Sequence, residues 1–338
     1  MGDGLLGEVL QGTSFALFDG AMGSMLVREG LGAGELPELL CLNQPQKITA
    51  IHAAYVEAGS QFVTTNTFGA NRRKLGGAAS VDEVYAAAVR CARDSGAHYV
   101  AADIGPIGGL MYPMGDLTFS QAYDLFFEQA RAACDAGADL VIIETMADLL
   151  EMSAAVLAVK DSCSLPMFAT MTFTETGRTF LGTTPNSAAL ALGMLGVDAL
   201  GVNCSAGPED LQPVVEEMLA VSTCPVIVQA NAGLPQVVNG QTVYTLAPEE
   251  YAQAVIPMIE GGASVLGGCC GTDPSYIRAL GAVLAYREPT ERQVNETRVR
   301  ELARVAADDD GRDAQIVGMI IEGETSEQIK EALIEEYE

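Results

Sequence analysis

The run Ser264–Thr272, SVLGGCCGT, is an apolar segment that ends in two adjacent cysteines flanked by glycines. Neighbouring side chains of an extended strand point to opposite faces, so Cys269 and Cys270 can serve one site only if the backbone turns between them. The glycines permit such a turn. The run therefore predicts a buried strand whose carboxyl end brings two thiols to one site.

Seven similar runs precede it, separated by segments with helical periodicity such as SQAYDLFFEQARAACDAGA, for which Ser120 is the expected N-cap. Alternating strands and helices call for a parallel sheet, and eight such units favour a closed (β/α)8 TIM barrel over an open doubly wound sheet. The seven runs are FALFDG from residue 15, QFVTTN from 61, YVAADIG from 99, LVIIET from 140, MFATMTF from 167, ALGVNC from 199 and PVIVQAN from 225.

Polar residues collect where these runs end. In a barrel the carboxyl ends of the strands share one face, and active sites are built there. We therefore expect one pocket lined by residues from all eight strand ends. These residues are Asp19, Asn66, Asp103, Glu144, Thr172, Asn203, Cys204, Asn231, Cys269 and Cys270.

Length and composition fit one barrel with an appendage. The chain has 338 residues and is 49% hydrophobic, which is enough for a single large core. We expect the barrel to occupy residues 1–287 and an acidic helical tail to occupy 288–338. The tail should contain two short helices around Gly323–Ser326, with Thr325 or Ser326 as N-cap. It is either a solvated appendage or a docking or dimer element. The second alternative is suggested by residues that could form an apolar stripe: Ile316, Met319, Ile320, Ile329, Leu333 and Ile334.

Charge and targeting signals limit the location and the partners. A formal net charge of -27 argues against nucleic acid or an anionic membrane as partner, since both require clustered positive charge. The first 12 residues lack the features of a signal peptide, and no apolar run is long enough to span a bilayer. A cytoplasmic protein with reduced thiols is expected.

Cys204, Cys269 and Cys270 are candidate zinc ligands at the ends of the sixth and eighth strands. Zinc prefers four tetrahedral ligands, so three protein sulfurs would leave one position open for a substrate. The two histidines, His52 and His98, are not at strand ends. We interpret the remaining cysteines as small buried hydrophobic residues; they are Cys41, Cys91, Cys134, Cys163 and Cys224.

The same face offers groups for an amino acid that carries a thiol. A zinc ion with three thiolates suits a substrate thiolate better than it suits activation of water, and that thiolate could attack a methyl group. Asp19 and Glu144 could hold a substrate ammonium by charge-assisted hydrogen bonds. The glycine-rich turns DGAMGS and IGPIGG could supply backbone N–H groups to its carboxylate.

Between Phe15 and Ala285 the sequence contains a series of distinctive motifs: FDGAMGSML, TNTFGANRRKL, DIGPIGG, IETMADLLE, TMTFTETGRTFLGT, GVNCSAGPE, NAGLP and GGCCGT. In these motifs the sequence resembles the homocysteine S-methyltransferases, most of all the homocysteine-binding module of the cobalamin-dependent methionine synthases. The resemblance implies a TIM barrel, zinc on Cys204, Cys269 and Cys270, and homocysteine held through its thiol by zinc and through its ammonium by Asp19 and Glu144. We also expect Asn66 and Asn203 to contact this substrate.

The sequence therefore predicts an enzyme that transfers a methyl group to homocysteine and forms methionine. The preferred donor is methylcobalamin or another methylcorrinoid on a separate protein, for which the tail is a candidate docking element. A same-fold enzyme that uses methyltetrahydrofolate, S-methylmethionine or betaine is an alternative, because Gln229 and Ala230 stand where the family pattern suggests a proline before Asn231. The other alternative is a noncatalytic zinc or thiol-binding protein.

Overall fold

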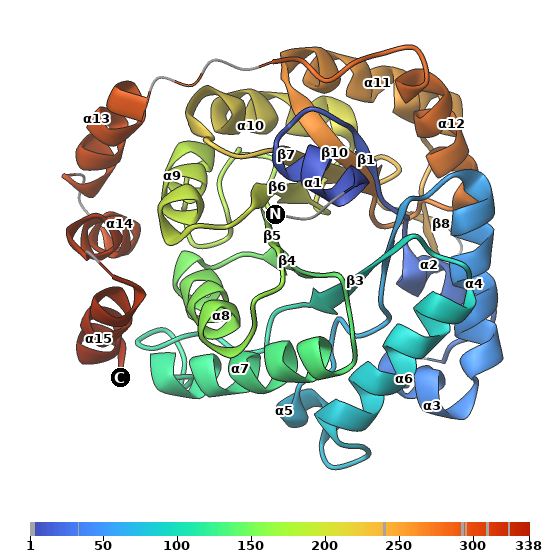
Figure 1. The fold of residues 1–338 in the computed structure, drawn as a ribbon, viewed down its shortest axis with the longest axis horizontal. Helices are drawn as coiled ribbons and strands as arrows, with labels where there is room; N and C mark the ends of the chain where they lie inside the picture. The colour runs from blue at the N-terminus through green and yellow to red at the C-terminus, as the bar shows by residue number, and fades with distance from the viewer. Residues whose placement is uncertain are drawn as a thin grey trace.

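The computed structural model describes residues 4–32, 34–238, 241–291, 294, 296–308, 311–323 and 325–338. Eight parallel strands form one sheet in the order β1-β10-β7-β6-β5-β4-β3-β2, and a bridge between Phe18 and Phe62 joins its two edges. This arrangement confirms the predicted (β/α)8 barrel (Figure 1). The strands are β1 (Ala16–Leu17), β2 (Phe62–Thr64), β3 (Tyr99–Ile104), β4 (Leu140–Met146), β5 (Met167–Met171), β6 (Ala199–Asn203), β7 (Val226–Ala230) and β10 (Ala263–Gly268).

Helices separate the strands along the chain and surround the barrel. The helix expected to begin after Ser120 begins earlier, at Phe119, because Thr118 and Gln121 form a capping box. The barrel helices are α2 (Met22–Arg28), η1 (Pro37–Leu39), α3 (Leu40–Asn43), α4 (Pro45–Ala58), α5 (Arg72–Leu75), α6 (Val81–Asp94), α7 (Phe119–Asp135), α8 (Leu149–Ser162), α9 (Pro185–Leu195), α10 (Pro208–Val221), α11 (Pro248–Gly261) and α12 (Pro274–Leu284).

Alternation along the strands divides their side chains between two cores. One set fills the interior of the barrel, where Phe18 stacks on Phe62 with ring centroids 4.9 Å apart. Helix α1 (Leu5–Leu10) closes one end of this interior with Leu6 and Val9 (Figure 1). The other interior residues are Ala16, Ala101, Leu140, Ile142, Phe168, Ala199, Ile227 and Val265.

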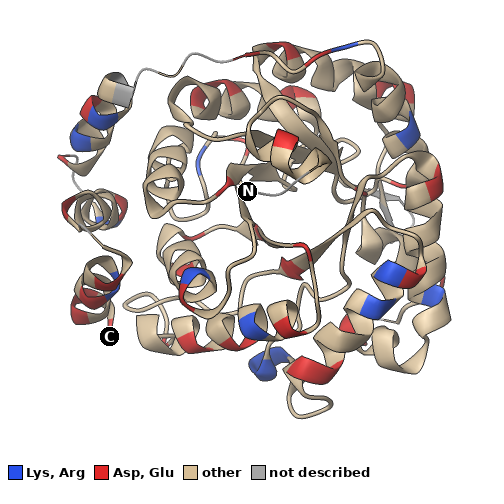
Figure 2. Ribbon diagram, in the orientation of Figure 1, with Lys and Arg blue, Asp and Glu red and all other residues tan. Residues whose placement is uncertain are grey.

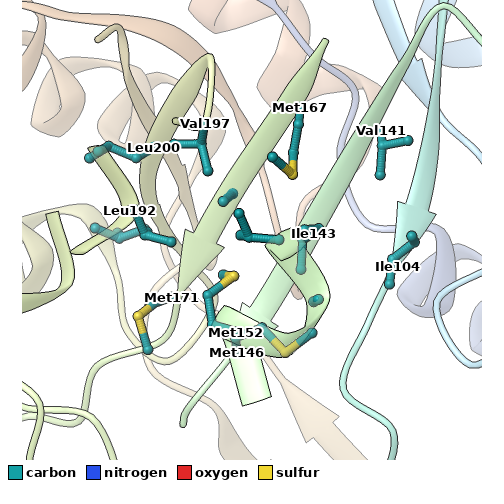
Figure 3. Packing of buried hydrophobic residues seen from close by; sticks show 14 of the residues in the cluster. Ile104, Val141, Ile143, Met146, Met152, Met167, Met171, Leu192, Val197 and Leu200 are labelled. Carbon is teal, nitrogen blue, oxygen red and sulfur yellow. The ribbon is translucent and has the colours of Figure 1, made fainter. Parts of the chain in front are cut away.

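The alternate side chains pack outward against the helices. Figure 3 shows Val141 and Ile143 of β4 beside Met167 and Met171 of β5, with Leu192 of α9 packed near them. All of these side chains are buried. This outer layer fixes the strands in place, so the polar residues that follow each strand are positioned by well-packed elements.

The last part of the chain forms three helices, one more than expected. They are α13 (Glu296–Ala307), α14 (Arg312–Glu322) and α15 (Ser326–Tyr337). Thr325 is the N-cap of α15, as predicted, whereas Glu324 of the expected break lies outside the described residues. Figure 1 shows the three helices in a row outside α7, α8 and α9.

The apolar stripe of this tail contacts the barrel. Ile316, Ile320 and Leu333 are each no more than 2% exposed and belong to the main hydrophobic core. Arg312 also donates to Asp148, the N-cap of α8, at 3.0 Å. The stripe is therefore not available for another partner, and only the outer surface of the tail is solvated.

Charged residues lie mainly on the helices and loops around the barrel, with acidic residues in excess (Figure 2). No helix in the described part of the chain combines the length and the apolar composition needed to cross a bilayer.

Candidate active site

The alternation that fills the barrel continues into a polar layer at the carboxyl ends of the strands. Glu144 lies two residues after the interior Ile142, and Asp103 lies two residues after Ala101. A period of two keeps such pairs on one face of a strand. The same relation places Thr64, Thr170 and Gln229 after Phe62, Phe168 and Ile227.

A cavity of about 310 Å³ lies above this polar layer. Seven of the ten residues expected at the strand ends line it: Asp19, Asn66, Asp103, Glu144, Cys204, Cys269 and Cys270. Thr172, Asn203 and Asn231 were also expected there and do not line it, although Asn203 reaches the site through its hydrogen bond to Glu144. Thr64, Glu38 and Gln229 line the cavity as well and were not among the expected residues.

The three thiols meet at one point. The sulfur atoms of Cys204, Cys269 and Cys270 all lie within 4.8 Å of one another, and Cys204 and Cys270 are 3.7 Å apart. The chain turns after β10, where the Thr272 N–H donates to the Cys269 carbonyl at 3.1 Å, and this turn brings both vicinal sulfurs to the cavity. The turn expected from the sequence is therefore present.

The two glycines beside the cysteines have different reasons to be there. Gly271 has a φ of 82°, a left-handed conformation that glycine adopts without strain. Gly268 has no such conformation; a Cβ atom there would lie 2.5 Å from the Thr272 hydroxyl. Glycine at 271 thus allows the turn, and glycine at 268 leaves room for the Thr272 side chain.

The sulfur geometry is compatible with a zinc ion. Tetrahedral zinc with bonds of about 2.3 Å to sulfur holds two thiolates about 3.8 Å apart, close to the 3.7 Å between Cys204 and Cys270. Hydrogen bonds from Cys269 and Cys270 lower the pKa of Cys204, and the contact with Cys204 raises the pKa of Cys270. A cation among the three sulfurs would stabilise the negative charge of the cluster.

Two non-glycine residues near strand ends have a strained, left-handed backbone. Cys204 and Thr145 have φ values of 61° and 62°, in a region that non-glycine residues rarely adopt. The Cys204 N–H donates to the Gln229 carbonyl at 3.0 Å, and the Thr145 N–H donates to Asn203 Oδ1 at 2.8 Å. Such conformations persist where the surroundings hold them, often at functional sites.

Asn203 fixes the position of Glu144. Its Oδ1 also accepts from Thr170 Oγ1 at 2.8 Å, while its Nδ2 donates to Glu144 Oε2 at 3.0 Å and to Thr145 Oγ1 at 2.7 Å. The Asn203 side chain is fully buried. Its amide is thus occupied by the protein, and it orients the carboxylate that faces the cavity.

Asp19 is held by the neighbouring strand. Its two carboxylate oxygens accept from the N–H of Thr64 at 2.8 Å and from Thr64 Oγ1 at 2.9 Å. Burial raises the pKa of Asp19 to about 7 despite these hydrogen bonds. Burial likewise raises the pKa of Glu144 to about 8, and negative charge on Cys204 and Asp19 adds to the rise. Both carboxylates would be stabilised by a positive group in the cavity.

Asn66 contributes to the wall with its amide turned toward protein atoms. Its Nδ2 donates to the Pro37 carbonyl at 2.8 Å and lies 3.6 Å from Cys41 Sγ.

The structure of the segment between β7 and α11 was not predicted from the sequence. It contains a hairpin, β8 (Gln236–Val238) and β9 (Gln241–Val243), followed by Tyr244, whose ring packs on Gly271 beside the thiols.

Comparisons with known proteins identify the family of this chain. The sequence matches the family described as Homocysteine S-methyltransferase over residues 16–284. It is 34% identical over 342 residues to methionine synthase of Mycobacterium tuberculosis (strain ATCC 25618 / H37Rv), covering 94% of this chain and 29% of that protein. It is also 34% identical over 290 residues to methionine synthase of Mycobacterium leprae (strain TN), covering 79% and 24%. The chain thus spans less than a third of the length of these relatives.

Solved structures show the same fold. The metallated form of the homocysteine methyltransferase MmuM from Escherichia coli matches with a TM-score of 0.70 at 22% identity, covering 82% of this chain and 99% of that chain. The oxidized form of that protein also matches with a TM-score of 0.70. The family match spans all eight barrel strands and the three-cysteine cluster. The chain therefore belongs to the homocysteine S-methyltransferase family, whose members are methyltransferases acting on homocysteine.

Proposed function

We propose that this chain uses zinc on Cys204, Cys269 and Cys270 to transfer a methyl group from a methylcorrinoid, carried by a separate protein, to the thiol of homocysteine. The observation that carries the proposal is the meeting of three sulfurs within 4.8 Å on the wall of a cavity that also contains buried carboxylates. Three protein ligands leave one zinc position for the substrate. When bound, zinc would keep the substrate sulfur deprotonated and nucleophilic at neutral pH.

The protein positions the rest of the amino acid. Asp19 and Glu144 face the cavity as acceptors for the ammonium group, and Thr64 and Asn203 fix their orientation. Asn66 forms part of the wall on the side of β2. With both ends of homocysteine held, its sulfur is aligned for in-line displacement, in which the S–CH3 bond of methionine forms as the bond from carbon to the donor breaks.

The size of the cavity supports a donor that approaches from outside. About 310 Å³ is at the low end for a small-ligand pocket and suits an amino acid better than a corrinoid. The loops that follow the barrel strands on the side of the cavity expose large apolar side chains, which we call the mouth rim. Its members follow β2, β3, β5 and β7 and are Phe68, Leu110, Tyr112, Met114, Phe180 and Leu234. Exposed apolar side chains on the same side as a small cavity suit a carrier protein that presents a large, flat macrocycle.

The thiol site also bears on location. Three free cysteines that bind a metal must stay reduced, and the cytoplasm is a reducing compartment. We therefore include a cytoplasmic location in the proposal.

The first test mixes zinc-loaded protein with free methylcobalamin, with and without homocysteine, and follows the visible spectrum together with methionine formation. Loss of the methylcobalamin spectrum that requires homocysteine and matches the methionine formed would support the proposal. A protein that is inactive with methylcobalamin and with a carrier-bound methylcorrinoid, but active with methyltetrahydrofolate, S-methylmethionine or betaine, would contradict the proposed donor. No response of the metal to homocysteine would favour a noncatalytic site.

A further inference from the structure

Buried side chains hold the backbone of Asp103 at the end of β3. Its N–H donates to Thr65 Oγ1 at 3.0 Å, and its carbonyl oxygen accepts from Thr67 Oγ1 and from the Tyr85 hydroxyl, both at 2.8 Å. Thr65, Thr67 and Tyr85 are all buried. Three side chains thus fix the backbone of this residue at the end of β3 and determine where its carboxylate lies.

The carboxylate of Asp103 has an oxygen with no partner. The residue is only 4% exposed and lines the cavity, and its Oδ1 atom makes no hydrogen bond. The other acidic groups of the cavity differ in this respect. Asp19 accepts two hydrogen bonds from Thr64, and Glu144 accepts one from Asn203. Glu144 also interacts with the Asp103 side chain, which leaves Asp103 Oδ1 as the oxygen without a partner. A buried polar atom without a partner is uncommon in proteins and indicates that something else pairs with it.

The identity of that partner follows from charge. Asp19, Asp103 and Glu144 reach the cavity from β1, β3 and β4, and the described residues that line it include no Lys or Arg. Burial raises the pKa of Asp103 well above its usual range, and the charges on Glu144 and Asp19 add to this effect. A cationic hydrogen-bond donor would relieve both the repulsion and the missing hydrogen bond.

We infer that the Asp103 carboxylate accepts a hydrogen bond from the substrate ammonium group and so forms a third acceptor beside Asp19 and Glu144. An ammonium group has three N–H donors, and three carboxylates from different strands can satisfy all of them. Asp103 then selects thiols that carry an amine over thiols that do not. This inference rests on the proposed function, because it assumes that an aminothiol occupies the cavity.

The test measures binding by titration calorimetry with zinc-loaded protein. The ligands are homocysteine and 4-mercaptobutanoate, which keeps the thiol and the carboxylate but lacks the amine. Asp103→Ala should weaken homocysteine binding roughly tenfold or more, as expected for loss of a hydrogen bond to a charged group, and should leave 4-mercaptobutanoate binding within about twofold. Asp103→Asn, which keeps an acceptor oxygen in place, should recover most of the affinity.

Glu151→Gln is the matched control. Glu151 is a buried carboxylate that accepts from the Ile107 N–H at 2.7 Å, and it lies outside the cavity lining. Glu151→Gln should leave the affinities for homocysteine and for 4-mercaptobutanoate unchanged. Unchanged homocysteine binding in Asp103→Ala, or equal losses for both thiols, would overturn the inference. If the wild type bound both thiols equally well, the ammonium subsite would be refuted and the thiol subsite retained. If it bound neither, the proposed function itself would fail.

Discussion

Cys204 combines two properties at the level of the single residue: a left-handed backbone and a thiol that two other thiols approach. A left-handed conformation costs a non-glycine residue about 1–3 kcal/mol. The next residue, Ser205, has a φ of 64° as well, and its hydroxyl contacts Thr172 Oγ1. The local strain at the end of β6 therefore aims a sulfur at the end of β10, and glycine at position 204 would relieve the strain while removing the ligand.

Removal of a thiol should remove the metal. We expect Cys269→Ser and Cys270→Ser to reduce bound zinc from about one ion per chain to almost none, because a neutral hydroxyl is a much weaker zinc ligand than a thiolate. Methyl transfer should be lost with the metal, while the circular dichroism of the barrel should be retained. Zinc content is measured by inductively coupled plasma mass spectrometry. Cys224→Ser, outside the cluster, is the control. Full zinc occupancy in both variants would contradict the ligand assignment.

His52 should make stability depend on pH. It is fully buried, neither ring nitrogen has a hydrogen-bond partner, and burial lowers its pKa to about 3. Because unfolded histidine has a pKa of about 6.5, the unfolded chain binds the extra proton first as the pH falls. The stability contributed by neutral His52 is thus complete above pH 6.5 and declines toward pH 3, by about 1.4 kcal/mol per pH unit and about 2 kcal/mol at pH 5.

The comparison of His52→Leu with wild type isolates this effect, since the raised pKa values of the buried carboxylates are common to both. Urea unfolding at pH 7 and pH 5 should show that the variant loses less stability than wild type over this interval. His98→Leu, at an exposed position, should behave as wild type. Equal losses in wild type and His52→Leu would show that His52 does not carry the dependence.

Much of the site could be predicted from single residues. The parts that could not be predicted depend on contacts between distant segments of the chain. The vicinal cysteines and the glycine after them identified the turn and the thiol cluster. The period of two within YVAAD and LVIIE also places Asp103 and Glu144 inside the barrel, and both line the cavity, although the sequence predicted a substrate contact for Glu144 alone of the two. The clamp of Asn203 on Glu144 was not predictable, because it depends on the register between strands that are not adjacent in sequence.

At the level of the element, helix α8 explains why the tail is attached to the barrel. Eleven consecutive residues, from Leu149 to Val159, are buried, so the helix has no solvent-facing stripe over this length. A helix that is buried all round must be covered on its outer side as well. The sequence LLEMSAAVLAV contained this signal, but it did not show that α14 and α15, more than 150 residues later, provide the cover.

Loss of one buried contact of the tail should make the tail helices open more often without destabilising the barrel. Leu333 is fully buried on α15, which packs on α7 and α8, and Leu333→Ala should weaken this attachment by about 2–5 kcal/mol. Hydrogen exchange followed by mass spectrometry should show faster exchange over residues 326–337 and little change in the barrel strands. Val305→Ala, 67% exposed on α13, is the control. Unchanged exchange over 326–337 would mean that Leu333 does not anchor the tail.

At the level of the whole molecule, the two ends of the barrel differ: one is closed by apolar packing and the other carries the candidate active site. Helix α1 closes one end with apolar side chains, and the polar layer, the thiols and the mouth rim lie at the other. The tail covers the side of the barrel, so its complete deletion would expose the apolar surface of α8 and α9 and could not test docking alone. A docking test must therefore change exposed residues that the fold does not need.

Phe180 offers such a test of the proposed carrier protein. It lies in the loop after β5 and is 74% exposed, so Phe180→Ala should not change the melting temperature or the affinity for homocysteine. If the mouth rim meets a carrier of methylcorrinoid, kcat/KM for the carrier should fall roughly tenfold, because exposed aromatic residues often dominate binding at an interface. Turnover with free methylcobalamin should fall much less. Tyr286→Ala is the matched control: Tyr286 is 92% exposed and follows α12, near the opposite end of the barrel. Equal losses in the two variants, or none in Phe180→Ala, would show that the carrier does not use the mouth rim at Phe180.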